Sequence, residues 1–140
     1  MHWAKSGDSL TTTIVQLLAL AYGVPFVMVG IEHFRDPQKF VDIVPPYLPF
    51  PLFLVYLTGL MEIACGLGII YPETRIMAGR FMVLFLLAVY PANFYMWTND
   101  VPFNGTRLTT NGHLVRLFVQ FLLIVAALGF SGDLQKIRRN

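Results

Sequence analysis

Four long apolar runs, separated by short polar segments, dominate the pattern of the chain. They cover residues 10–31, 51–71, 76–97 and 114–130, and each contains at most one charged side chain. A helix needs about 20 mostly apolar residues to cross the hydrocarbon core of a bilayer. A lone strand would leave its backbone polar groups unsatisfied in lipid, so each run is predicted to be helical. The pattern therefore predicts an all-α membrane protein, a four-transmembrane-helix bundle.

The segment between the first two runs carries the signals of a further short helix. Asp36 is a good N-cap, and Pro37 suits the first helical position because its missing N–H would be unpaired there in any case. We predict a short interfacial helix from Pro37 to about Val44, ended by Pro45 and Pro46. Such a helix is expected to lie on the membrane surface or to cap the bundle.

The last loop contains two Asn-Gly pairs, Asn104-Gly105 and Asn111-Gly112, and each is a strong signal for a tight turn. The loops leave little room for a soluble domain, so residues 1–140 are predicted to form a single membrane domain. The first run is too long for the apolar region of a signal peptide, and we expect it to be retained as a span.

Composition narrows the classes of function. Hydrophobic residues make up 56% of the chain and charged residues 13%, with a formal net charge of +2 and no basic block. This excludes a nucleic-acid partner and makes the lipid bilayer the main partner. The single cysteine, Cys65, excludes an intrachain disulfide. The predicted helices contain no His-x-x-x-His or Glu-x-x-His pair, so we predict no metal site and no cofactor held within the chain.

The distribution of cations predicts the orientation. Four spans place both termini on one side of the membrane, and that side holds six of the ten Lys and Arg residues: Lys5, Arg75, Arg80, Lys136, Arg138 and Arg139. The opposite side holds the other four: Arg35, Lys39, Arg107 and Arg116. The positive-inside rule therefore predicts that both termini are cytoplasmic.

Several polar side chains lie inside the predicted spans, where ionisable groups are costly and usually face the bundle interior. Glu62 lies near the middle of the second span. Gly59, Cys65 and Gly66 share its helix face, and small residues allow close helix approach, so Glu62 is expected to point at another helix.

Two further polar stripes lie on the third and fourth spans. Tyr90, Asn93 and Trp97 share one face of the third span. His113, Arg116 and Gln120 share one face of the fourth span. The first span ends at Glu32 and His33. In the predicted topology these residues converge on the outer half of the bundle, with Glu62 and Gln120 deeper.

This convergence predicts a ligand-binding site. Its expected members are Glu62, Asn93, Arg116, Gln120, Tyr90, Trp97, His33 and His113. We expect Glu62 to couple to Arg116, directly or through Gln120, and Tyr90 and Trp97 to form walls. The competing interpretation is structural: such polar groups also fix helix register, interfacial histidines bind water or loop carbonyls, and aromatic residues form interfacial belts.

Five ordered segments resemble a known family: Gly30–Phe40, Val44–Pro49, Leu57–Gly68, Tyr90–Asn93 and Arg116–Gln120. Together they resemble the DoxX-like family of small bacterial membrane proteins, over about residues 14–130. The resemblance implies a four-helix protein of the bacterial cell inner membrane. Some relatives are subunits of quinone-linked sulfur-oxidising enzymes, and others are linked to redox-stress complexes or protein maturation. The matching motif positions are His33, Pro37, Glu62, Asn93, Arg116 and Gln120.

Three functions remain open at this point. The first is a ligand-binding accessory subunit of a redox system, oxidoreductase-associated, that holds a quinone-like or lipid-like molecule and receives electrons from a redox partner protein. The second is a non-catalytic assembly or scaffold protein. The third is a small transporter, which four spans allow only as a homo-oligomer. The residues name neither the ligand nor a reaction.

Overall fold

Four long helices form the framework of the protein, and two short helices accompany them. The computed structural model describes residues 9–140. The helices are α1 (Ser9–Arg35), α2 (Gln38–Val41), α3 (Pro51–Ile70), α4 (Arg75–Thr98), α5 (Thr110–Ser131) and α6 (Asp133–Arg139). The four long helices have the length and apolar composition needed to cross a bilayer. The predicted all-α fold with four spans is confirmed, and the chain is a membrane protein.

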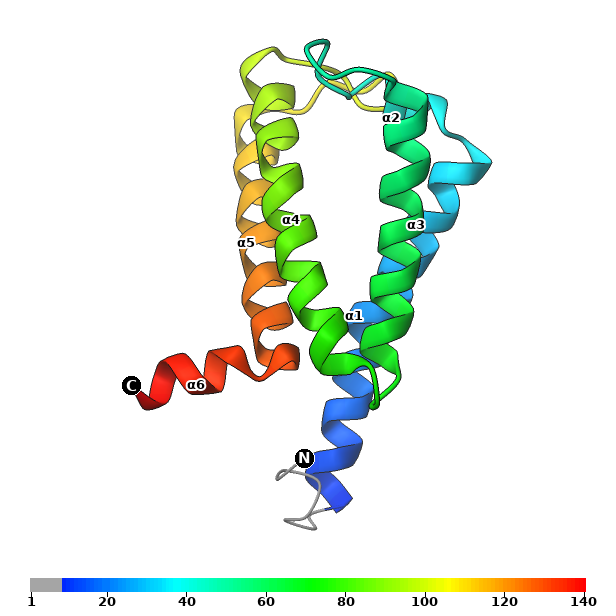
Figure 1. Cartoon of the computed structure of the whole chain (residues 1–140). Coiled ribbons are helices and arrows are strands. Elements are labelled where there is room, and N and C mark those ends of the chain that lie inside the picture. The colour runs from blue at the N-terminus through cyan, green and yellow to red at the C-terminus, as the bar shows by residue number, and fades with distance from the viewer. Residues whose placement is uncertain (1–8) are drawn as a thin grey trace.

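The four long helices associate as two pairs (Figure 1). One pair is α1 with α3, and the other is α4 with α5. The pairs approach each other, through α3 and α4, at the end where α6 leaves the bundle, which we call the lower end. They diverge toward the opposite, upper end, where the loops before α3 and after α4 cross between them (Figure 1).

Glycines set the close approach of α1 and α3. Gly23 and Gly30 on α1 lie opposite Gly66 and Gly59 on α3. A Cβ added at Gly23 would lie 2.5 Å from the carbonyl oxygen of Gly66, and one at Gly30 would lie 2.7 Å from that of Gly59. Both glycine pairs are spaced by seven residues, so they meet every second turn. Backbone contact of this kind drives helix association where water supplies no hydrophobic force.

Polar side chains close the lower end of α3. The last carbonyl groups of a helix have no partner within the helix, which is costly in a membrane. Thr74 Oγ1 donates to the carbonyl of Gly68 (2.7 Å), and Arg75 Nε donates to that of Ile69 (2.8 Å). Arg75 also donates to Gln16 Oε1 on α1 (2.7 Å), so this cap ties α1, α3 and α4 together.

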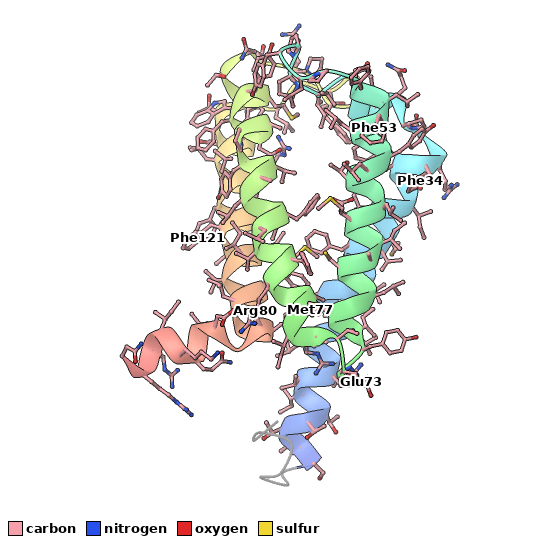
Figure 2. All side chains as sticks on the ribbon, in the orientation of Figure 1. Phe34, Phe53, Glu73, Met77, Arg80 and Phe121 are labelled. Atoms are coloured by element: carbon pink, nitrogen blue, oxygen red, sulfur yellow. The ribbon has the colours of Figure 1, made fainter. Side chains whose placement is uncertain are left out.

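The outer surface of the bundle is apolar, as a lipid-facing surface requires. Phe34 on α1 and Phe121 on α5 project from opposite flanks (Figure 2). Their exposed fractions are 45% and 53%, and many other large apolar side chains on the four long helices are equally exposed. In water such a surface would be an aggregation liability, whereas in hydrocarbon it is matched to its surroundings.

The first loop differs from its prediction in detail. The predicted short helix is present as α2, but it ends at Val41 and not near Val44. Its N-cap is Pro37, so the expected cap at Asp36 is wrong by one residue. After Asp42 the backbone N–H groups bond three residues back, as in Val44 to Val41, and the chain tightens into turns.

The last loop confirms one of two predicted turns. Asn104 and Gly105 have positive φ values of 50° and 79°, and Phe103 and Thr106 pair around them. Asn111-Gly112 is not a turn, and that prediction is wrong. Both residues lie in the first turn of α5, where the Thr109 side chain accepts from the Gly112 N–H (3.1 Å) as the N-cap.

The cations of the predicted inner side lie at the lower end, with one outside the described residues. Lys5 falls outside residues 9–140. Lys136, Arg138 and Arg139 lie on α6. This helix was not predicted. Gly132, with φ 80°, ends α5 in the left-handed conformation and turns the chain away from the bundle (Figure 1).

Candidate ligand-binding site

A cavity of about 350 Å³ lies between the two helix pairs, inside the membrane-spanning region. Its volume falls within the range of small-molecule pockets, which is about 300–1,000 Å³. Four of its lining residues are polar, namely Glu62 from α3, Asn93 from α4, and Arg116 and Gln120 from α5. The other lining residues are apolar: Phe26, Phe85, Leu86, Val89, Val115, Val119 and Leu123.

Glu62 forms the polar group on the α3 side of the cavity. Its Oε2 lies 3.3 Å from Nδ1 of His33, which is the neighbouring buried side chain on α1. The same Nδ1 lies 2.8 Å from the carbonyl oxygen of Val29. Because a carbonyl only accepts, Nδ1 carries a hydrogen and donates to Val29. That donation leaves Glu62 Oε2 without a hydrogen-bond partner among the described residues.

The short helix α2 covers this pair from above. The ring of Phe40 stacks on the imidazole of His33, with centroids 3.7 Å apart. Phe40 in turn contacts Phe103 from the last loop, with centroids 5.7 Å apart. The two upper loops therefore meet over His33, and the predicted capping role of the first loop has a structural basis.

The opposite wall is a chain of hydrogen bonds between α4 and α5. Arg116 Nη2 donates to Asn93 Oδ1 (3.0 Å), and Asn93 Nδ2 donates to Gln120 Oε1. Gln120 Nε2 then donates to the carbonyl of Leu86 (2.8 Å). Arg116 Nη1 lies 2.9 Å from the sulfur of Met96. The predicted convergence of Asn93, Arg116 and Gln120 is confirmed.

The two charged groups of the cavity do not pair with each other. Across residues 9–140, the contacts within 4.0 Å between basic and acidic groups place the His33 ring beside Glu62 and give Arg116 no carboxylate partner. Gln120 bonds to Asn93 and Leu86, so it does not bridge Glu62 to Arg116. The expected contact between Glu62 and Arg116 is therefore wrong. The reason is the paired architecture, which places these residues on diverging pairs with the cavity between them.

One family model covers this architecture. A model described as a domain of unknown function, DUF8561, matches residues 22–131. The chain belongs to the DUF8561 family. The match includes every residue that lines the cavity, whereas α6 lies beyond it. No curated protein and no solved structure matches the chain.

Four predicted site residues of this DUF8561 protein lie outside the cavity lining, and one of them, His33, lies behind Glu62. Tyr90 donates its hydroxyl to the carbonyl of Leu117 (2.7 Å) and so ties α4 to α5. Trp97 stacks on His113 near the upper end, with centroids 6.3 Å apart. His113 is 2% exposed, and neither ring nitrogen has a hydrogen-bond partner among the described residues. Tyr90 and Trp97 are therefore not the walls of the cavity, and His113 is buried beside Trp97, outside the cavity.

The apolar walls were not identified from the sequence. Phe26, Phe85 and Val89 face the cavity, yet they stand in runs where nearly every position is apolar. In such runs the side that faces lipid and the side that faces a cavity have the same composition, so hydrophobic periodicity gives no signal. Only the polar members of the site were detectable.

Proposed function

We propose that this DUF8561 protein binds an amphipathic, quinone-like molecule inside the membrane and serves as an accessory subunit of a redox system. One observation carries the proposal. A carboxyl group with an unpartnered oxygen and a guanidinium without a carboxylate partner line opposite sides of one cavity. A charged side chain inside a span normally pairs with another group or marks a functional pathway.

The cavity suits a flat head group that carries oxygen acceptors. Arg116 has five N–H donors, and two of its nitrogens are engaged with Asn93 and Met96. Its remaining donors are available to a carbonyl oxygen. Glu62 supplies an acceptor or a proton carrier on the other side. Phe26, Phe85 and Val89 would contact the ring and the start of the tail. Few polar groups beside apolar walls are typical of small-molecule sites.

The redox setting rests on the resemblance to DoxX-like proteins. Four of the matching motif positions, Glu62, Asn93, Arg116 and Gln120, line the cavity. We therefore propose a bacterial inner-membrane location and a redox partner protein as the source of electrons. A lipid-like ligand with a similar head group belongs to the same proposal, and the assay below separates the two.

The proposed orientation has both termini in the cytoplasm. The lower end carries Arg75 and Arg80 together with the three cations of α6, whereas Arg35, Lys39 and Arg107 lie at the upper end. This asymmetry follows the positive-inside rule. Reporter fusions after Asn140 and within residues 99–109 test it: a cytoplasmic reporter should be active only in the first fusion. The reverse pattern would invert the orientation.

A ligand-dependent thermal shift tests the binding function. The purified protein is heated with a short-tailed quinone, with a phospholipid, and with a tail-matched hydrocarbon that lacks carbonyl groups. The quinone should stabilise the wild type by about 2.7 kcal/mol at 100 times Kd, by mass action. Glu62→Gln and Arg116→Gln should bind at least about tenfold more weakly, a loss of about 1.4 kcal/mol.

Matched variants outside the cavity control for charge. Glu32→Gln and Arg107→Gln remove the same charges from ion pairs at the upper end, with Arg35 or Lys39 and with Asp100, and should bind like the wild type. If no compound shifts the wild type and the cavity variants fold as well as it does, the scaffold function should replace this one. The closed hydrogen-bond chain between α4 and α5 is the observation that favours a scaffold.

A further inference from the structure

A second, larger hollow runs along the lower half of the bundle between α1 and α5. Its volume is about 1,350 Å³, and its long walls are apolar. The α1 wall extends from Thr11 to Val29, which corresponds to ~27 Å at 1.5 Å per residue. Leu123, Ala126 and Phe130 form the α5 wall. We call this hollow the lower groove.

An aromatic bridge forms the base of the lower groove. Tyr22 donates its hydroxyl to the carbonyl of Leu123 (2.8 Å), which links α1 to α5. Its ring lies against Phe26 and Phe130, with centroids 5.1 Å and 5.4 Å apart. These contacts hold α1 and α5 together across the groove while the remaining length stays lined by apolar side chains. The groove therefore has a fixed base and an apolar length suited to a hydrocarbon chain.

The lower end of this groove is cationic. Arg75, Arg80, Lys136 and Arg139 all line it, and the last two lie on α6, which leaves the bundle at this end (Figure 1). Figure 2 shows Arg80 near the start of α6. The nearby carboxylate is Asp133, which accepts from Arg80 Nε (3.0 Å) and Nη2 (3.2 Å) and lies 3.9 Å from Lys136. Arg80 is thus paired with Asp133, and Arg75 is buried against the end of α3 with Glu73 nearby. Lys136 and Arg139 are exposed, and they are the cations of the groove end that remain open to a ligand.

We propose that the lower groove binds one anionic phospholipid, with an acyl chain along α1 and α5 and the phosphate at Lys136 and Arg139. Charge complementarity selects an anionic head group, because the groove end carries an excess of cations at the predicted membrane surface. The apolar walls select an acyl chain, since the groove opens to the hydrocarbon region. The cationic residues lie outside the central cavity, so the head-group contacts are separate from the proposed quinone site, although the two hollows share Phe26, Glu62 and Leu123 at their junction.

Native mass spectrometry with titrated lipids tests the proposal on the full chain. Phosphatidylglycerol and phosphatidylcholine with identical acyl chains are added to detergent-solubilised protein. The double variant Lys136→Gln with Arg139→Gln removes both exposed cations and leaves Arg80 to hold Asp133. Its matched control is Arg138→Gln with Arg107→Gln. Arg138 is on α6 but does not line the groove, and Arg107 lies in an upper loop.

The wild type should retain one phosphatidylglycerol and lose phosphatidylcholine. Each cation near a membrane surface contributes about fivefold to anionic lipid binding, so the groove double variant should weaken phosphatidylglycerol by about 25-fold. The control double should change it less than about threefold. Ala126→Phe, which fills the groove without changing charge, should also abolish retention while the helical circular dichroism and melting stay intact.

Three outcomes would overturn the proposal. Equal retention of both lipids would show that charge does not select the occupant. Equal weakening by the two double variants would assign the effect to overall charge and not to this site. Unchanged phosphatidylglycerol retention in a folded Ala126→Phe variant would show that the acyl chain lies elsewhere. None of these outcomes depends on quinone binding, which is measured through Glu62 and Arg116.

Discussion

The upper halves of the two helix pairs are held together by different means. In α1–α3 the contact is made by backbone against backbone at Gly23, Gly30, Gly59 and Gly66. In α4–α5 the upper half is joined by the chain of side-chain hydrogen bonds through Arg116, Asn93 and Gln120, together with the bond from the Tyr90 hydroxyl. Close packing fixes the first pair. Polar contacts fix the upper half of the second pair, and in its lower half Gly79 of α4 packs against the backbone of Ala127 and Ser131.

The difference explains why a cavity exists between the pairs. In the upper half, the glycine contacts and the hydrogen bonds are made within each pair. Few side chains of the helices are then left to bond one pair to the other there. Glu62 belongs to the packed pair and Arg116 to the hydrogen-bonded pair, and they face each other without contact. A bundle built only for packing would place such charges against each other. The separation of these two charged groups is thus the feature that most favours a binding role.

The largest expected effect comes from the glycine contacts. Gly23→Ala should destabilise the protein by about 1–3 kcal/mol, because its Cβ would lie 2.5 Å from the Gly66 oxygen and force the helices apart. Gly129→Ala on α5 is the control, since its Cβ would meet nothing closer than 4.0 Å. That change should stabilise by up to about 1 kcal/mol through helix propensity. Unfolding in detergent with increasing denaturant measures both, and a neutral Gly23→Ala would contradict the packing account.

The next effect concerns the hydrogen-bonded pair. Asn93→Ala removes the partner of both Arg116 and Gln120, and should cost about 1–2 kcal/mol from two lost bonds. Asn99→Ala, on an exposed residue bonded to the carbonyl of Tyr95, should cost less than about 0.5 kcal/mol. The same unfolding assay measures them. Equal costs would show that the network adds nothing to the α4–α5 contact.

A smaller effect separates the two possible partners of Glu62. A double-mutant cycle between Glu62→Gln and His33→Ala should give a coupling of about 1 kcal/mol, because the groups touch at 3.3 Å. The cycle between Glu62→Gln and Arg116→Gln should be additive within about 0.5 kcal/mol, since the cavity separates them. A larger coupling in the second cycle would show that Arg116 interacts directly with Glu62. The proposal that the two charged groups are separated by a binding cavity would then lose its support.

The smallest effect is the pH dependence of the α6 junction. The hydrogen bonds from Arg80, and then from Ser131, lower the pKa of Asp133 below its ordinary value. Because the pKa is lowered on folding, ionised Asp133 stabilises the folded protein above its unfolded pKa, near 3.9. This stabilisation is lost as the pH falls through the folded pKa. The melting difference between wild type and Asp133→Asn should therefore shrink below about pH 4. In an Arg80→Gln background the pH trend should flatten.

The fold was predictable because long apolar runs admit few structures in lipid. The residues around Glu62 also predicted its direction correctly, since Gly59 and Gly66 mark the face that packs on α1. Its partner was misassigned because polar stripes do not say which helices are neighbours. A different feature of the sequence identifies the neighbouring helices, because Gly23 and Gly30 on α1 repeat the seven-residue spacing of Gly59 and Gly66 on α3. The helix after Gly132 was also detectable, from a glycine placed to end α5.

Photolabelling with an azido-quinone tests the central claim most directly, because it locates the ligand. The account predicts labels on peptides that carry Glu62, Phe85, Val89 or Val119, all from the cavity lining. Excess unlabelled quinone should remove these labels, and Glu62→Gln should reduce them. Labels confined to lipid-facing residues such as Phe121, and not removed by competitor, would contradict a binding site between the helix pairs.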